Sequence, residues 1–172
     1  PAGSQPNGDF TSCDTCIAGK VSSDGVECVT CGVGEGVVAT SERSLCEACP
    51  IGYIGVDGVC IRCENGYEPN DVGGDCVECG PGYAGLDGIC EECPGGSEPT
   101  GDRSSCTVCL TGHYRETGMA MCEQCRNGEE TVNNRTGCAS CPLSHSGAGG
   151  ECTRCPSGRQ PSGAAIANHN VR

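Results

Sequence analysis

The chain has 172 residues, and 20 of them are cysteine, a share of about 12% that is typical of disulfide scaffolds. Leu, Ile, Val and Phe together number only 24, which excludes a single large hydrophobic core and argues against an enzyme with a dry pocket. The formal net charge is −13, with one Lys and nine scattered Arg, so nucleic acid is excluded as a partner. No run of apolar residues reaches the roughly 18 to 20 that a membrane helix needs.

Residues 1–12 are rich in Gly, Pro, Ser and Asn, which predicts a linker. After the linker, every cysteine belongs to a Cys-x-x-Cys pair, and two successive pairs make a period of about 30 to 33 residues, as in a tandem array. The period predicts five modules, at 13–45, 46–75, 76–105, 106–137 and 138–160, followed by a tail at 161–172. No cysteine follows Cys155 at the expected distance, which favours a segment of a longer ectodomain.

Two kinds of loop alternate between the pairs. The first kind, after Cys49 and Cys79, contains a Tyr and an Asp-Gly step between apolar residues. Asp-Gly in this setting predicts a two-residue hairpin turn. We therefore expect Val56 to face Val59 and Leu86 to face Ile89 across short hairpins. Two tyrosines of these loops, Tyr53 and Tyr83, are expected either to cover a disulfide or to lie partly exposed.

The second kind of loop carries a glycine three residues after the cysteine. It follows Cys63, Cys93 and Cys125, and it is usually longer and richer in Asn, Ser and Thr than the first kind. No helical periodicity persists for three turns anywhere in the chain. The sequence therefore predicts strand pairs and turns throughout.

Three kinds of chemistry use Cys-x-x-Cys pairs. Two neighbouring pairs can supply the four thiolates of a zinc site, but each such site adds a charge of −2 to a chain that is already acidic. A redox pair needs a thiolate of lowered pKa, whereas five of the ten pairs enclose a carboxylate, which disfavours a thiolate. The even count, the regular spacing and the missing core favour structural disulfides.

The spacing leaves more than one disulfide pairing open. One pattern links the first cysteines of consecutive pairs, and likewise the second ones, which closes loops of about 14 to 19 residues. We favour this pattern because it uses every cysteine. It joins Cys13 to Cys28, Cys16 to Cys31, Cys46 to Cys60, Cys49 to Cys63, Cys76 to Cys90, Cys79 to Cys93, Cys106 to Cys122, Cys109 to Cys125, Cys138 to Cys152 and Cys141 to Cys155. The competing pattern joins the second cysteine of each pair to the first of the next, which leaves Cys13 and Cys155 over.

The pattern Cys-x-x-Cys-Pro-x-Gly-Tyr-x-x-x-x-Gly-x-Cys-x-x-Cys runs most cleanly through 46–63 and 76–93. It resembles the ephrin-receptor-like and growth-factor-receptor cysteine-rich repeats. It is also similar to the modules of tumour necrosis factor receptors and to the Cys-x-x-Cys-rich variant surface proteins of parasitic protists. This resemblance covers about residues 13–160 and implies an extracellular rod of stacked modules with the first of the two pairings.

A few residues outside the pairs are candidate sites. Asn134-Arg135-Thr136 is an N-glycosylation acceptor in a polar loop. His113, His145 and His169 each lack a second ligand at metal-binding spacing, so we expect surface histidines. We expect no catalytic residue, no metal ligand and no cofactor.

The predicted fold class is therefore a small disulfide-rich, elongated tandem array of about five two-disulfide modules, with short β-hairpins and turns and no single core. The predicted function is a non-enzymatic extracellular spacer, structural or adhesive, of a cell-surface coat or appendage. Its partners would be proteins or further copies of itself, without nucleic acid and without membrane insertion by this segment. Two alternatives remain, the ectodomain of a receptor for a protein ligand and a zinc-binding array.

Overall fold

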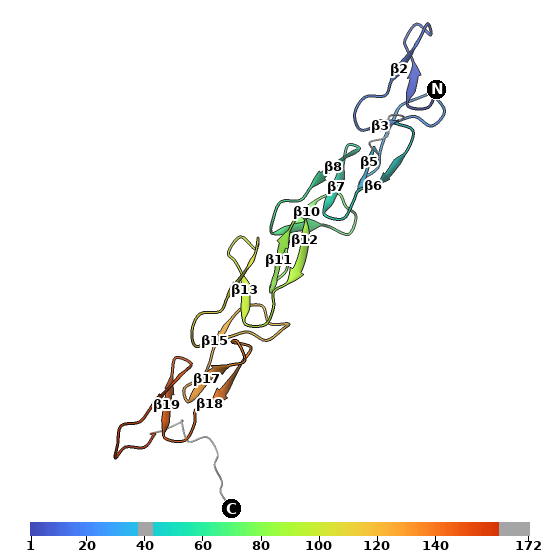
Figure 1. The fold of residues 1–172 in the computed structure, drawn as a ribbon. Coiled ribbons are helices and arrows are strands. Elements are labelled where there is room, and N and C mark those ends of the chain that lie inside the picture. Colours follow the sequence, from blue (N-terminus) through green and yellow to red (C-terminus); the bar gives the residue numbers. More distant parts are fainter. Residues whose placement is uncertain (38–42, 162–172) are drawn as a thin grey trace, which may run out of the picture. The chain divides into compact units, whose positions relative to one another are not determined.

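The structure, a computed structural model, describes residues 1–37 and 43–161, and it describes the side chain of every one of these residues except Val37. In these residues it forms twenty short strands and no helix (Figure 1). Each strand pairs with one neighbour in the sequence, so the described part of the chain is a succession of ten two-stranded hairpins. The fold class of a disulfide-rich tandem array is confirmed.

The hairpins alternate between two types that match the two kinds of loop. We call A hairpins those in the pairs β3(Lys20–Val21)/β4(Val29–Thr30), β7(Tyr53–Val56)/β8(Val59–Arg62), β11(Tyr83–Leu86)/β12(Ile89–Glu92), β15(His113–Tyr114)/β16(Glu123–Gln124) and β19(His145–Ala148)/β20(Glu151–Arg154). We call B hairpins those in the pairs β1(Ser4–Pro6)/β2(Cys13–Thr15), β5(Glu35–Val37)/β6(Cys46–Ala48), β9(Tyr67–Pro69)/β10(Cys76–Glu78), β13(Ser97–Pro99)/β14(Cys106–Val108) and β17(Glu129–Val132)/β18(Gly137–Ser140).

The Asp-Gly turns form as the sequence predicts. Asp57 and Gly58 have φ values of 50° and 76°, the positive values that a type I′ turn requires at both central positions. This turn pairs Val56 with Val59 directly across the hairpin. Asp87 and Gly88 adopt the same conformation between β11 and β12.

Every hairpin after a cysteine pair begins with one recurring turn. In the hairpin after Cys49, the amide of Tyr53 donates to the carbonyl of Pro50 at 3.0 Å, and Gly52 has a φ of +85°. A positive φ at the third position defines a type II turn, for which glycine is the favoured residue. Gly66, Gly96 and Gly128 of the B loops have the same positive φ. Ser144 takes the corresponding place with a φ of +68°.

The favoured disulfide pairing is wrong, and the ladder pairing is the one that the structure forms. In the described residues the A hairpins contain the disulfides Cys16–Cys28, Cys49–Cys60, Cys79–Cys90, Cys109–Cys122 and Cys141–Cys152, and the B hairpins contain Cys31–Cys46, Cys63–Cys76, Cys93–Cys106 and Cys125–Cys138. Each bond therefore joins the start of a hairpin to its own return strand. Cys13 and Cys155 have no disulfide partner among the described residues.

Strand geometry explains the ladder. The two cysteines of a pair, such as Cys60 and Cys63, are three residues apart along extended chain, so their side chains point to opposite faces. The first sulfur therefore closes the hairpin that is ending, and the second sulfur starts the next one. Shortening a loop from about 16 to about 13 residues changes its entropic contribution by only about 0.2 kcal/mol, so strand geometry has to outweigh only the one additional loop that the rejected pairing would close.

This pairing also changes the predicted boundaries. The disulfide of each disulfide-bonded B hairpin, such as Cys31–Cys46, joins cysteines that the sequence analysis placed in neighbouring modules. Residues 1–12, expected as a linker, contribute β1, which pairs with β2 through Ser4, Gln5 and Pro6. The tail at 161–172 lies outside the described residues except for Pro161.

Hydrogen bonds between hairpins hold each of two compact units together, which comprise the described residues of 1–79 with 85–90 and those of 80–84 with 91–161. In the first unit, the carbonyl of Gly55 accepts from the amide of Gly34 at 3.1 Å, and the amide of Gly55 donates to the carbonyl of Gly73 at 2.7 Å. This A-hairpin residue therefore joins the B hairpins before and after it. In the second unit Arg115 does the same with Gly96 and Arg135.

Glycines let successive hairpins of one type approach closely. A Cβ on Gly52 would lie 2.4 Å from the carbonyl oxygen of Asp87 at the tip of the next A hairpin. In the second unit a Cβ on Gly112 would lie 1.7 Å from the oxygen of Gly149. Real Cβ atoms do not come within 3.0 Å of such atoms. The turn glycine is therefore required twice, once for its φ and once for the space beside it.

Half-cystines replace a hydrophobic core. Among the described residues the buried apolar set consists of Val21, Ala84 and eight half-cystines. Large aliphatic side chains instead lie mostly on the surface, such as Ile51, Leu110 and Leu143, which are 82%, 72% and 79% exposed. The cross-links therefore supply the constraint that apolar packing supplies in ordinary domains.

Candidate functional site

The cysteine sulfur atoms are the groups that distinguish this chain chemically. Eighteen of the twenty cysteines lie in disulfides with Cα–Cα distances between 5.5 and 5.8 Å, the usual separation for a disulfide. A disulfide sulfur is not a thiolate and does not serve as a ligand of the kind that a zinc site needs. In the part of the chain that the structure describes, no three His, Cys, Asp or Glu side chains gather in a group that could hold a metal ion.

The two remaining thiols lie in opposite units. Cys13 is exposed on β2 and Cys155 is half-buried just after β20. The amide of Cys155 donates to the carbonyl of Ser144 at 2.8 Å, as Cys63 does to Gly52 at 2.9 Å. The backbone around Cys155 thus repeats the arrangement of the disulfide-bonded second cysteines.

The predicted glycan acceptor lies at a hairpin tip. Asn134 is exposed, with a φ of +58°, in the turn between β17 and β18. The hydroxyl of Thr136 donates to the carbonyl of Asn133 at 2.8 Å, and the guanidinium of Arg135 donates to the carbonyl of Cys109. The side chain of Asn134 is thus accessible, and its glycosylation stays a prediction.

The described histidines make local contacts with the backbone. His113 and His145 each place Nδ1 near the carbonyl oxygen two residues earlier, at 3.2 and 3.1 Å. His169 lies outside the described residues. Tyr53 is half-buried opposite Arg62 across its hairpin, and Tyr83 is 41% exposed, so both tyrosines, each the first residue of its strand, are partly exposed.

A buried arginine is the polar residue that sequence reasoning missed. The side chain of Arg115 is fully buried and donates to the carbonyls of Met119 at 2.6 Å, Cys93 at 2.7 Å and Gly82 at 3.2 Å. Its guanidinium also lies 3.5 Å from the carboxylate of Glu92. A signal existed in the sequence, because Arg115 stands six residues after its cysteine, where three of the other four A loops have glycine and the first has Ser22.

One exposed carboxyl has an altered pKa. Asp102, at the tip between β13 and β14, accepts a hydrogen bond from the hydroxyl of Thr100 at 2.7 Å and further ones from the amide and hydroxyl of Ser104. These donors, Thr100 foremost, lower the pKa of Asp102 from 3.8 to about 2. The carboxylate therefore acts as a local turn acceptor.

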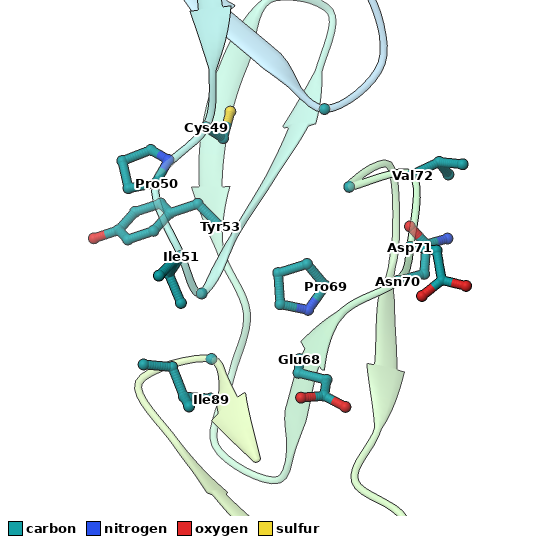
Figure 2. A pocket seen from close by; sticks show the side chains of 14 residues that line it. Cys49, Pro50, Ile51, Tyr53, Glu68, Pro69, Asn70, Asp71, Val72 and Ile89 are labelled. Carbon is teal, nitrogen blue, oxygen red and sulfur yellow. The ribbon is translucent and has the colours of Figure 1, made fainter. Parts of the chain in front are cut away.

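The first unit has a groove on its surface. It has a volume of about 450 Å³ and lies between the turn that precedes β7 and the loop between β9 and β10. Figure 2 shows Pro50, Ile51 and Tyr53 on one side, Asn70, Asp71 and Val72 on the other, and Pro69 between them. Ile89 lies near Ile51, and Glu68 lies below Pro69 in the same view.

Comparison of the sequence with protein-family models and with curated proteins finds no match. Among the described residues, no helix has the length and apolar character needed to span a bilayer. The recurring pairs, hairpins and disulfides thus show a cysteine-rich repeat chain.

Proposed function

We propose that the chain is a non-enzymatic extracellular spacer, structural or adhesive, that belongs to a cell-surface coat or appendage. The observation that carries this proposal is the disulfide in each of nine successive hairpins of the described chain. Disulfides persist in oxidising compartments, so a chain that depends on them for its fold suits an extracellular location. Small disulfide-dense domains of secreted proteins follow the same logic.

The repeat organisation supports a spacer or scaffold more than a catalyst. Within each unit, backbone hydrogen bonds join neighbouring hairpins, as Gly55 does with Gly34 and Gly73, so hairpins can be added without redesigning a core. The negative charge keeps such a chain soluble and discourages indiscriminate self-association. Resemblance to receptor and protist surface repeats agrees with this role.

Surface labelling tests the location. Antibodies against residues 1–161 should stain intact cells that express the protein as strongly as permeabilised cells. A membrane-impermeant biotin reagent should label the protein on those cells, with a cytosolic protein as the control for leakage. Staining that requires permeabilisation would contradict the extracellular proposal.

A deletion that respects the ladder tests the spacer role. Removing residues 63–92 takes out one B hairpin and one A hairpin and leaves Arg62 joined to Cys93, with every remaining disulfide intact. We expect the shortened chain to fold and to be displayed as the full chain is. Beads coated with the full or the shortened protein then distinguish an adhesive protein from a receptor. If the protein is adhesive, beads coated with the shortened chain still aggregate. If it is a receptor whose ligand site lies in residues 63–92, the shortened chain no longer binds the ligand.

Intact mass separates these roles from the zinc alternative. A zinc array loses mass when a chelator removes the ions, whereas a disulfide chain gains mass only on reduction. A chelator-sensitive mass of the native protein would refute the disulfide-based proposal.

A further inference from the structure

The groove of the first unit has a wall of uncovered aliphatic side chains. Ile51, Val72 and Ile89 line it with exposed fractions of 82%, 67% and 44%. Two prolines add rigid apolar surface, Pro50 beside Ile51 and Pro69 between the two sides (Figure 2). Exposed aliphatic side chains from separate hairpins thus line one concave site, which offers a partner several apolar contacts in one place.

The walls of the groove are held in place by the hairpin stacking. Gly52 and the tip at Asp87 approach each other so closely that the side with Ile51 and the side with Ile89 form one surface. The opposite side is fixed by Asn70, whose amide and side chain both bond within the loop that ends at Asp75. A preformed groove loses little conformational entropy when it is filled.

The charges around the groove are negative. Glu68 and Asp71 are the ionisable carboxylates among its lining residues, and no Lys or Arg lines it. Glu68 is held by the amide of Cys90, which donates to it at 3.4 Å. Arg62, which lies in β8, is paired with Asp87 at 2.8 Å and is therefore already neutralised. An occupant that complements this groove carries positive charge beside an apolar group.

We propose that this groove binds a peptide segment of a partner protein, in which a large aliphatic side chain lies next to Arg or Lys. The aliphatic side chain would contact Ile51, Pro69 and Ile89, and the cation would face Asp71. A chain segment suits the site better than an enclosed small molecule, because the high exposure of its wall residues leaves the groove open to solvent. Binding at this groove goes beyond the spacer role and does not depend on it.

The probes for the test are three fluorescein-labelled peptides, added to the complete chain with its disulfides intact. Their sequences are Gly-Arg-Leu-Leu-Arg-Gly, Gly-Glu-Leu-Leu-Glu-Gly and Gly-Arg-Ser-Ser-Arg-Gly. Fluorescence anisotropy should show saturable binding of the first peptide, with a Kd at least about tenfold lower than for either of the others. Binding should weaken with added salt, because charge contributes to it. Absence of saturable binding by the first peptide, or equal binding of the acidic one, overturns the proposal.

Matched variants locate the binding. Ile51→Ser should raise the Kd of the first peptide at least about fivefold, whereas Leu143→Ser should leave it within about twofold. Leu143 is the right control because it occupies the same turn position after its cysteine and is 79% exposed. Both side chains project into solvent, so neither substitution removes a core contact. Equal effects of the two substitutions would show binding elsewhere on the surface and would refute the groove.

Reversal of one charge at the groove distinguishes binding at the groove from general attraction of a basic peptide to an acidic chain. Asp71→Lys should raise the Kd of the peptide Gly-Arg-Leu-Leu-Arg-Gly and lower the Kd of the peptide Gly-Glu-Leu-Leu-Glu-Gly, each at least about fivefold. Asp9→Lys makes the same change in net charge at another exposed tip, and it should change neither Kd by more than about twofold. Identical results for the two variants would refute the role of Asp71. Failure of these binding tests would leave the surface-staining result untouched, so the two proposals fail separately.

Discussion

Replacing Gly112 with alanine tests whether close stacking of hairpins holds the second unit together. The new Cβ would lie 1.7 Å from the carbonyl oxygen of Gly149, so the hairpin β19/β20 has to retreat by at least about 1 Å. That movement breaks the bonds from Thr131 to Gly150 at 3.2 Å and from Gly128 to Gly147 at 3.0 Å. Each lost bond costs about 1 kcal/mol, and forcing alanine to a φ of +78° costs about 1 to 2 kcal/mol more.

The matched control is Gly118→Ala in the same A hairpin. Gly118 has a φ of +91°, but a Cβ there meets nothing within 4 Å. The free energy of unfolding of this variant is therefore lowered only by the conformational term of about 1 to 2 kcal/mol, which is offset in part because alanine also restricts the unfolded chain. The difference between the two variants isolates the contact between hairpins, and we expect it to be about 2 kcal/mol or more.

Amide hydrogen exchange measured by NMR provides the assay, because it reports each hairpin separately. A difference of about 2 kcal/mol lowers protection by a further factor of about 30. We expect this loss at the amides of Gly128 and Thr131 in Gly112→Ala, and no such loss in Gly118→Ala. The amide of Cys63, in the other unit, should keep its protection in both variants. Equal protection at Gly128 in the two variants would show that the stacking contact contributes nothing.

Three further outcomes follow from the structure. Alkylation of the native protein should label Cys13 and Cys155 and no other cysteine, and peptide mapping should then recover disulfides such as Cys49–Cys60. A chain without free thiols, in which Cys46 is bonded to Cys60, would show that the rejected pairing is the right one. Arg115→Met should lower the free energy of unfolding of the second unit by about 3 kcal/mol in guanidinium titrations followed by circular dichroism, because the carboxylate of Glu92 and the carbonyls that Arg115 bonds lose their donor. Arg62→Met breaks an exposed ion pair and should lower the free energy of unfolding by less than about 1 kcal/mol. Equal losses of stability in the two variants would contradict the structural role of the buried Arg115. The carboxyl of Asp102 should titrate with a pKa of about 2 by carbon NMR, and Thr100→Val should move this pKa toward 3.8. Since the pKa is lower in the folded state, the stabilising effect is present above about pH 4 and is lost as the pH falls through about 2. An unchanged pKa in Thr100→Val would show that the hydroxyl of Thr100 does not cause the shift.

Local features were predictable because their causes lie within a few residues. The Asp-Gly steps at 57–58 and 87–88 carry their own turn preference, so the pairing of Val56 with Val59 followed from the sequence. The alternation of two loop kinds likewise predicted the alternation of A and B hairpins. The shortage of large apolar residues predicted the absence of a core, and the buried apolar set of the described residues consists mainly of half-cystines.

The candidate groove was not predictable, because its lining residues come from four separate hairpins. Ile51 and Ile89 are brought together only by the approach of Gly52 to the tip at Asp87, and Pro69 arrives from a B hairpin. Nothing in the sequence gives the distance between such loops. Arg115 is a similar case, since its burial depends on carbonyls contributed by Gly82 and Cys93, more than twenty residues away.

By itself, the sequence determined that this protein is a disulfide-stapled tandem array of hairpins, because cysteine spacing, turn residues and the lack of apolar residues are all local or compositional properties. Only the tertiary structure decided which sulfurs meet. Each bond of the ladder closes a loop whose entropic contribution differs by only about 0.2 kcal/mol from that in the rejected pairing, and the rejected pairing would close one more loop, worth about 3 kcal/mol. Loop entropy therefore does not account for the ladder. The choice comes from geometry, since cysteines three residues apart, such as Cys60 and Cys63, face opposite sides of an extended chain and so close two different hairpins.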